Sequence, residues 1–158
     1  MPKHPVIRAA TAALVTAAGL AAQWGPVTTP NTPSARSGAM MAFDVQQNRM
    51  LMFGGNATNE LWSFANGTWT QLAPAVTPGP RHRSAMAADS IAGSIVLYGG
   101  IDASGGQSQL ALDDTWTWTG SNWQQQTPVT TPGGRARHAM VYDLVRQVTV
   151  LFGGRLNL

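Results

Sequence analysis

The chain has 158 residues, 44% of them hydrophobic and only 11% charged, which is enough for one domain with a substantial core. It has no cysteine, so a disulfide framework, a thiolate zinc site and a thiol nucleophile are excluded. Of its 10 Lys and Arg residues, Lys3 and Arg8 lie near the N-terminus, which leaves 8 against 7 acids in the rest. This balance gives no reason to expect nucleic-acid or membrane-surface binding.

Residues 1–23 have the layout of a secretory signal peptide. Lys3 and Arg8 precede the uncharged run Ala9–Ala22, which ends in small residues. This run of about 14 residues is shorter than the roughly 20 that a membrane-spanning helix needs. We therefore expect a signal helix that is removed, no membrane association after cleavage, and a secreted or periplasmic location. The alternatives are an ordinary alanine-rich helix and a chance translated leader.

One short pattern, an apolar run that ends in an aromatic residue and two glycines, occurs three times in the remaining chain. Its copies are Met50–Gly55, Ile95–Gly100 and Val148–Gly154, and their first glycines are 45 and 54 residues apart. The same two intervals separate three tryptophans, three arginines and three aspartates: Trp24, Trp69 and Trp123; Arg36, Arg81 and Arg135; Asp44, Asp89 and Asp143. The chain is thus built from a unit of about 45 residues, with an insertion in the second copy within Ile101–Leu112.

Each unit is predicted to contain four short antiparallel strands. The first begins near Ser37, and the second is the apolar run, since β-branched and aromatic residues favour strands. The third alternates aromatic and small polar residues, as in Leu61–Phe64 and Thr115–Thr119. The fourth follows a turn signal such as Asn66-Gly67. The repeated residues expected to hold the units together are Gly54, Gly55, Gly99, Gly100, Gly153, Gly154, Trp69 and Trp123.

Four-stranded units of this kind are typical of propeller blades, which bury their faces by stacking on one another. We expect complete blades at about 36–72 and 81–126, and two strands of a further blade in 135–158. Trp24 would begin a lone strand. The tryptophans are expected to fill the space between adjacent sheets.

The order glycine pair, Asp113–Trp118, Trp123 and Arg137–Met140 resembles the kelch repeat, and the resemblance covers residues 24–158. It implies an all-β, kelch-type β-propeller whose innermost strands begin near the repeated arginines and whose outermost strands carry the repeated tryptophans. Two blades and their flanks cannot close a ring of the roughly four to eight blades typical of propellers. The sequence therefore predicts the incomplete front part of a larger propeller, in residues 24–158.

The candidate binding residues cluster where the inner strands begin. The repeated Arg36, Arg81 and Arg135 could line a channel mouth, or they could brace a neighbouring blade. Arg83 and Arg137 have no arginine counterpart in the first unit, where Gly38 stands at the equivalent position. The residues predicted to bind a ligand are Arg81, Arg83, Arg135, Arg137, His82 and His138.

No catalytic residue, metal or cofactor is predicted. Glu60 is the only glutamate, so no pair of acids suggests glycoside hydrolysis, and no Ser-His-Asp pattern or phosphate-binding loop is found. Some kelch propellers are oxidases whose copper site uses a Cys-crosslinked tyrosine. This chain has no cysteine, so the resemblance does not imply that chemistry here. The insertion Ile101–Leu112 is a candidate contact loop or a tolerated surface excursion.

These features favour an exported, non-enzymatic module that binds an unidentified protein or glycan ligand through loops on one face. The alternative is part of an extracellular carbohydrate-active propeller enzyme, oxidase- or epimerase-like, whose catalytic residues lie elsewhere. A third reading is a truncated frame without independent function, since a fold does not by itself fix a function. Self-association is expected through the open blade edge after Gly154.

Overall fold

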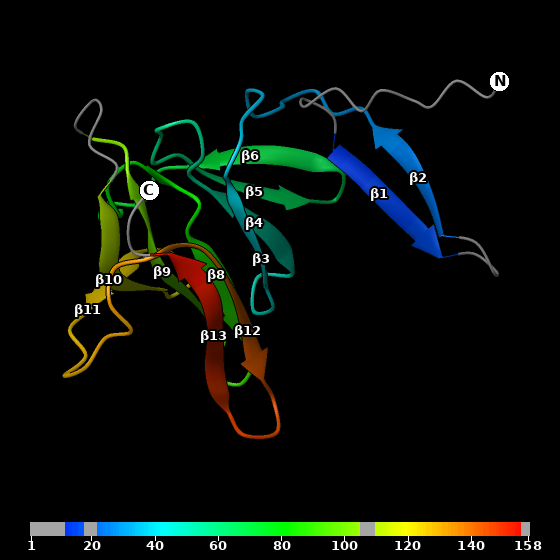
Figure 1. The fold of residues 1–158 in the computed structure, drawn as a ribbon. Coiled ribbons are helices and arrows are strands. Elements are labelled where there is room, and N and C mark those ends of the chain that lie inside the picture. The colour runs from blue at the N-terminus through cyan, green and yellow to red at the C-terminus, as the bar shows by residue number, and fades with distance from the viewer. Residues whose placement is uncertain (1–11, 18–21, 105–109, 156–158) are drawn as a thin grey trace, which may run out of the picture.

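The structure, a computed structural model, describes residues 12–17, 22–104 and 110–155, with the backbone alone for 12–17 and 22–24. Every regular element in these residues is a strand, and all pairs are antiparallel (Figure 1). The all-β prediction is therefore confirmed. None of the described residues forms a helix that is long and apolar enough to cross a membrane.

The first large sheet consists of four consecutive strands in chain order, and we call it blade 1. Its strands are β3 (Met40–Asp44), β4 (Arg49–Phe53), β5 (Leu61–Ala65) and β6 (Thr68–Leu72). Asp44 closes the β3–β4 turn by accepting a hydrogen bond from the Gln47 N–H at 3.1 Å. Asn66 and Gly67 both have positive φ, 49° and 74°, as a two-residue hairpin turn between β5 and β6 requires.

The second large sheet, which we call blade 2, has the same order with a divided first strand. Its strands are β7 (Arg81–His82), β8 (Ala85–Asp89), β9 (Ser94–Asp102), β10 (Ala111–Trp118) and β11 (Trp123–Gln126). Both β7 and β8 pair with β9, which continues through β10 to β11. The register of β10 on β9 shifts between Leu112 and Thr115. Part of the insertion predicted as a contact loop, residues 105–109, lies outside the described residues.

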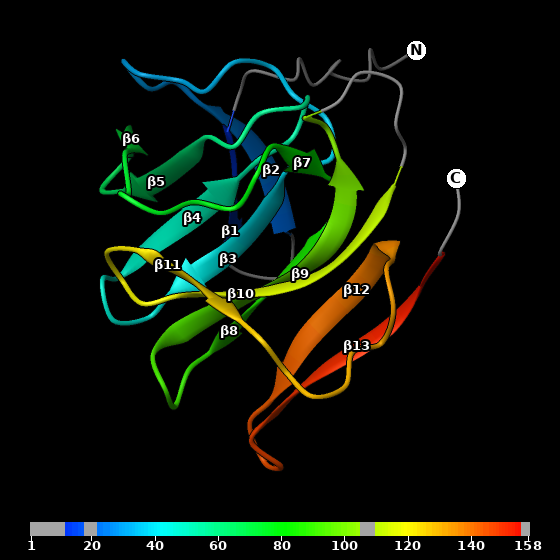
Figure 2. The same cartoon turned by 90° about the vertical axis from the view of Figure 1, so that its left-hand side faces the viewer.

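A third sheet has two strands, β12 (Ala136–Asp143) and β13 (Val148–Arg155), paired from Ala136↔Arg155 to Asp143↔Val148. The first strands of the three sheets pack side by side, β3 against β8 and β8 against β12 (Figure 2). These are the strands that the kelch resemblance implies to be innermost.

Two expectations for the N-terminal region are wrong. Residues 12–17, within the predicted signal helix, form the strand β1 (Ala12–Ala17), and the predicted lone strand at Trp24 is β2 (Ala22–Val27), which pairs with β1. Backbone N–H and C=O groups of a strand need hydrogen-bond partners. No blade strand among the described residues pairs with β2, and β1 supplies these partners instead. The other residues of the predicted signal peptide up to position 21 lie outside the described residues.

The core lies between blades 1 and 2 and is built from both. Its buried members are Met40, Ala42, Leu51, Phe53, Leu61, Met86, Ile95, Leu97, Trp116, Trp118 and Trp123. The Trp123 ring lies 5.4 Å from the Phe53 ring across the two blades and 5.5 Å from the Trp118 ring. These tryptophans fill the space between the sheets, as the sequence predicts. Trp69, the counterpart of Trp123 in blade 1, is also buried, and its ring lies 5.0 Å from that of Phe64 in the same sheet.

Candidate functional site

The repeated arginine of each unit binds the glycine pair of its own sheet. Arg81 donates from Nη1 to the Gly99 carbonyl at 3.1 Å and makes a two-pronged ion pair with Asp114 at 2.7 and 2.8 Å. Only 2% of Arg81 is exposed. Burial opposes ionisation of Asp114, but the hydrogen bonds and charge of Arg81 outweigh it and lower the pKa of that carboxyl. The structure therefore places Arg81 inside the fold and not on a binding surface.

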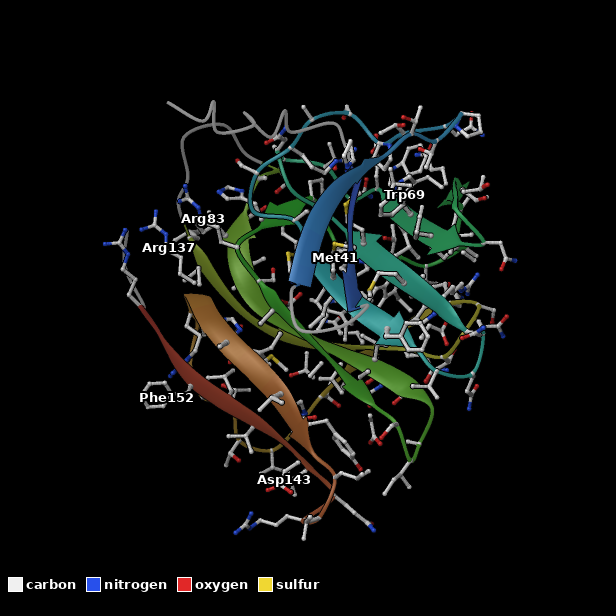
Figure 3. The ribbon with its side chains drawn as sticks, turned by 90° about the vertical axis from the view of Figure 1, so that its right-hand side faces the viewer. Met41, Trp69, Arg83, Arg137, Asp143 and Phe152 are labelled. Atoms are coloured by element: carbon white, nitrogen blue, oxygen red, sulfur yellow. The ribbon has the colours of Figure 1, made fainter. Side chains whose placement is uncertain are left out.

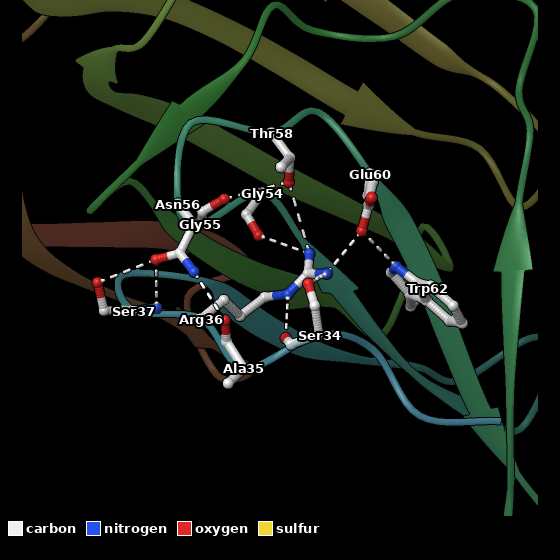
Figure 4. A network of polar contacts seen from close by, with 10 residues as sticks. All are labelled: Ser34, Ala35, Arg36, Ser37, Gly54, Gly55, Asn56, Thr58, Glu60 and Trp62. Carbon is white, nitrogen blue, oxygen red and sulfur yellow. Dashed lines mark hydrogen bonds and ion pairs between the residues drawn. The ribbon is translucent and has the colours of Figure 1, made fainter. Parts of the chain in front are cut away.

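Arg36 makes the same contacts in blade 1 (Figure 4). Its Nη1 donates to the Gly54 carbonyl at 3.2 Å, and its Nη2 lies 2.6 Å from Glu60 Oε2. The Trp62 Nε1 also donates to Glu60 at 2.9 Å, and this bond, followed by that from Arg36, lowers the pKa of the Glu60 carboxyl. Trp116 donates to Asp114 in the same way at 2.6 Å.

The acids that hold these arginines are absent from the residues that the sequence singled out for the site. Glu60 and Asp114 are 54 residues apart, and each stands two positions before a tryptophan of the third strand. That shared spacing is the signal that could have identified them. In the third unit Arg135 donates to the carbonyls of Gly153, at 3.3 Å, and of Gly133, at 3.2 Å, and none of the described carboxylates pairs with it.

The backbone carbonyls of Arg81 and Arg135 also join neighbouring sheets. The Gly55 N–H donates to the Arg81 carbonyl at 3.0 Å, and the Gly100 N–H donates to the Arg135 carbonyl at 2.9 Å. A Cβ atom at Gly54 would lie only 2.5 Å from the Arg81 carbonyl oxygen, and one at Gly99 only 2.6 Å from that of Arg135. The first glycine of each pair thus allows the next sheet to approach closely.

The predicted binding residues Arg83 and Arg137 have different surroundings from Arg81 and Arg135. The Arg83 N–H donates to the Gly38 carbonyl at 2.8 Å, and the Arg137 N–H donates to the Arg83 carbonyl at 2.9 Å, so one line of backbone bonds links the three units. All three residues have left-handed φ: 69° for Gly38, 58° for Arg83 and 63° for Arg137. Glycine adopts this conformation without cost, whereas a residue with a side chain does not.

Arg83, Arg137 and Arg155 form what we call the arginine cluster, at one end of the sheets. Figure 3 shows Arg83 and Arg137 beside each other, far from Asp143 at the other end of β12. Arg83 is half-buried and the other two arginines are exposed. Partial loss of hydration, followed by the charges of Arg155 and Arg83, lowers the pKa of the Arg137 guanidinium. The positive charges of Arg83 and Arg155 therefore act on Arg137.

No carboxylate compensates this cluster in the part of the chain that the structure describes. All seven acids of the sequence lie in that part. The ion pairs found there use other arginines: Arg36–Glu60, Arg49–Asp44, Arg81–Asp114 and Arg146–Asp143. The cluster is thus a site of uncompensated positive charge that can hold a carboxylate or another anion.

The two predicted histidines, His82 and His138, have different surroundings. His82 is half-buried, and burial, followed by the charges of Arg83 and Arg137, lowers the pKa of its imidazole. His82 therefore belongs with the arginine cluster. His138 is buried, its ring lies 5.7 Å from that of Tyr98, and neither ring nitrogen has a hydrogen-bond partner among the described side chains and backbone. His138 thus belongs to the contact between blade 2 and the third sheet.

No group of three or more His, Cys, Asp or Glu side chains that could hold a metal ion occurs in the residues that the structure describes.

Antiparallel four-stranded sheets that stack along neighbouring inner strands, with an arginine and a glycine pair in each unit, define a repeat protein of the β-propeller class. The family model of the KLHDC2/KLHL20/DRC7 Kelch-repeats domain matches residues 15–158, so the chain belongs to this kelch-repeat family. A comparison with curated proteins gave no match.

Proposed function

We propose that this chain is a protein-binding module that holds an acidic segment of its partner at the arginine cluster. Kelch repeats generally mediate protein binding, and this supports a binding role over catalysis. The oxidase- or epimerase-like alternative has no observation in its favour among the described residues. A glycan ligand would need carboxylate or sulfate groups to use the same charges.

The observation that carries the proposal is the backbone conformation of two arginines. Arg83 and Arg137 have φ of 58° and 63°, whereas the equivalent position in the first unit is Gly38. A side-chain-bearing residue in this conformation costs about 1–3 kcal/mol, and such strain gathers at functional sites. Glycine, as at Gly38, adopts this conformation at lower cost, which supports a role for the two guanidinium groups beyond stability.

The positive charges of the arginine cluster indicate that its ligand carries carboxylates. Guanidinium groups bind carboxylates through two parallel charge-assisted hydrogen bonds. Each such bond contributes about 1.5–3 kcal/mol, which is roughly tenfold or more in affinity. The cluster has donors to spare because none of the described acids occupies it.

Titration of the purified chain with an octaglutamate peptide, followed by fluorescence anisotropy, tests the proposal. Octaglutamate should bind, octaglutamine and octalysine should not, and the affinity should fall as salt rises. Arg83→Gln and Arg137→Gln should each weaken binding about tenfold. Arg146→Gln is the matched control, since this exposed arginine pairs with Asp143 at the far end of β12. Equal binding by all four proteins would rule out the site.

We also propose that the chain is exported. The basic start with Lys3 and Arg8 and the apolar run Ala9–Ala22 support this, since together they have the composition of a signal peptide. Expression with the native N-terminus in a secreting bacterial host, followed by N-terminal sequencing of the exported protein, is the test. A new terminus near Ala22 is expected, and an intact Met1 on exported protein would exclude cleavage.

A further inference from the structure

The strand β13 leaves an apolar row exposed that its two counterparts bury. Phe152 is 82% exposed, whereas the equivalent Phe53 in β4 and Tyr98 in β9 are 0% and 3% exposed. Val148 and Val150 lie on the same face as Phe152 and are also exposed. We call Val148, Val150 and Phe152 the exposed row.

Phe53 packs against Trp123 of the next blade, whereas no sheet of a following unit is described beside β13. The strands also differ in their partners along the sheet. β4 is paired on both sides, by β3 and β5, and β9 is paired by β8 and β10. β13 pairs with β12 alone, so alternate N–H and C=O groups along its other edge have no strand partner among the described residues. Such an edge is a template for pairing with another chain.

The other outer edges of the blades expose polar side chains and no apolar row. The outermost strands β6 and β11 expose polar residues: Thr68, Thr70 and Gln71 in β6, and Gln124, Gln125 and Gln126 in β11. β13 has neither proline nor charge before Arg155. β13 thus combines an apolar row with the absence of charged side chains and proline, two of the usual means of preventing edge pairing.

We propose that β13 pairs antiparallel with β13 of a second copy of this chain, about a two-fold axis at Val150. Two strands from each copy then form a sheet of four, the size of blade 1 in this molecule. A two-fold contact also closes at two copies, so both open edges are used.

This register matches the side chains on both strands. Phe152 lies opposite Val148 of the second copy, and the reverse pair forms on the other side of the axis. An aromatic residue opposite a β-branched one is a favourable cross-strand pair. The two Arg155 residues are each five positions from the axis, which separates them by roughly 34 Å. This exceeds the Debye length of about 8 Å at physiological salt, so their charges do not oppose pairing.

A cysteine cross-link tests the register directly, because the chain has no cysteine of its own. Residues directly opposite each other have Cα atoms about 4.5–5.5 Å apart, within the range of a disulfide. Val150→Cys should therefore give a disulfide-linked dimer under mild oxidation. Thr149→Cys, one position away, and Val129→Cys, in an exposed loop, should cross-link much more slowly.

Sedimentation over a range of concentrations tests the association itself. The purified full chain should form a dimer, and Val150→Lys should weaken dimerisation at least tenfold while Val129→Lys leaves it unchanged. Thermal melting of Val150→Lys shows whether the variant is folded, and Val150 is exposed enough to tolerate the change. A monomer at every concentration, open-ended polymers, or equal cross-linking at positions 150 and 129 would overturn the proposal.

Discussion

Arg81 and Arg83 are two residues apart on the same edge of blade 2, but they have different roles. Arg81 is buried, bound to Asp114 through both terminal nitrogens, and recurs in all three units. Arg83 is half-buried, has left-handed φ, and is replaced by Gly38 in the first unit. A residue that every unit repeats holds the units together, whereas one that departs from the repeat at a conformational cost is the better candidate for binding.

The largest effect is expected from Arg81→Met. The change leaves Asp114 partly buried without its cation, and breaking such a pair costs about 3–5 kcal/mol. Chemical denaturation measures the loss in free energy of unfolding. Arg146→Met is the control, because its pair with Asp143 is exposed to solvent and contributes little to stability. Equal losses for both variants would contradict the structural role of Arg81.

A smaller loss is expected from Gly38→Ala. A Cβ atom there would lie 3.2 Å from the Arg83 backbone nitrogen, and its φ of 69° strains a residue with a side chain. The two effects together should cost about 1–3 kcal/mol in unfolding free energy. Gly67→Ala separates them, because Gly67 has φ of 74° with nothing within 4 Å of the added atom. A greater loss at Gly67 would contradict the close approach at Gly38.

The buried His138 should make the fold sensitive to acid. Burial, followed by the charge of Arg135, lowers the pKa of its imidazole below the ordinary 6.5. The unfolded chain then binds more protons than the folded one, so stability is full above about pH 6.5 and falls as the pH decreases toward the folded-state pKa. Melting curves between pH 5 and 8 measure this slope, and His138→Leu should reduce it. An unchanged slope would show that other groups cause it.

His82 should make ligand binding depend on pH in the opposite direction. Burial and the charges of Arg83 and Arg137 lower its pKa, and a bound anion would offset those charges and raise it again. Binding then takes up a proton, so affinity for octaglutamate should increase as the pH falls from 7 to 5. Titrations at several pH values measure this modest effect. His82→Gln should remove it, and a pH dependence that persists in that variant would exclude His82 as its source.

Much of the fold could be predicted from the sequence because the repeat fixes it. The glycine pairs, the alternating Trp strand of Thr115–Trp118 and the turn at Asn66-Gly67 each have a local signature of the element they form. The pairing of β1 with β2 could not, because the alanine-rich run has no strand signature and the choice depends on a partner for β2.

The site was less predictable because it depends on backbone conformation. The left-handed φ of Arg83 and Arg137 is imposed by bonds to other units, and nothing in their side chains signals it. The carboxylate partner of Arg36 was also not predicted, although Glu60 and Asp114 share one spacing before a tryptophan. Glu60 lies 24 residues along the chain in the same sheet as Arg36 and not in a neighbouring blade. For Arg83 and Arg137, the only indication in the sequence was that glycine, Gly38, stands at the equivalent position of the first unit.

The double variant Arg83→Gly/Arg137→Gly tests the central distinction most directly, with stability and binding measured on the same protein. Removing both left-handed arginines should raise the free energy of unfolding by roughly 0.5–2 kcal/mol, the relief of strain less the greater freedom of glycine in the unfolded chain. The same protein should lose its affinity for octaglutamate. A variant that is less stable than the natural chain and binds the peptide equally well would contradict the account.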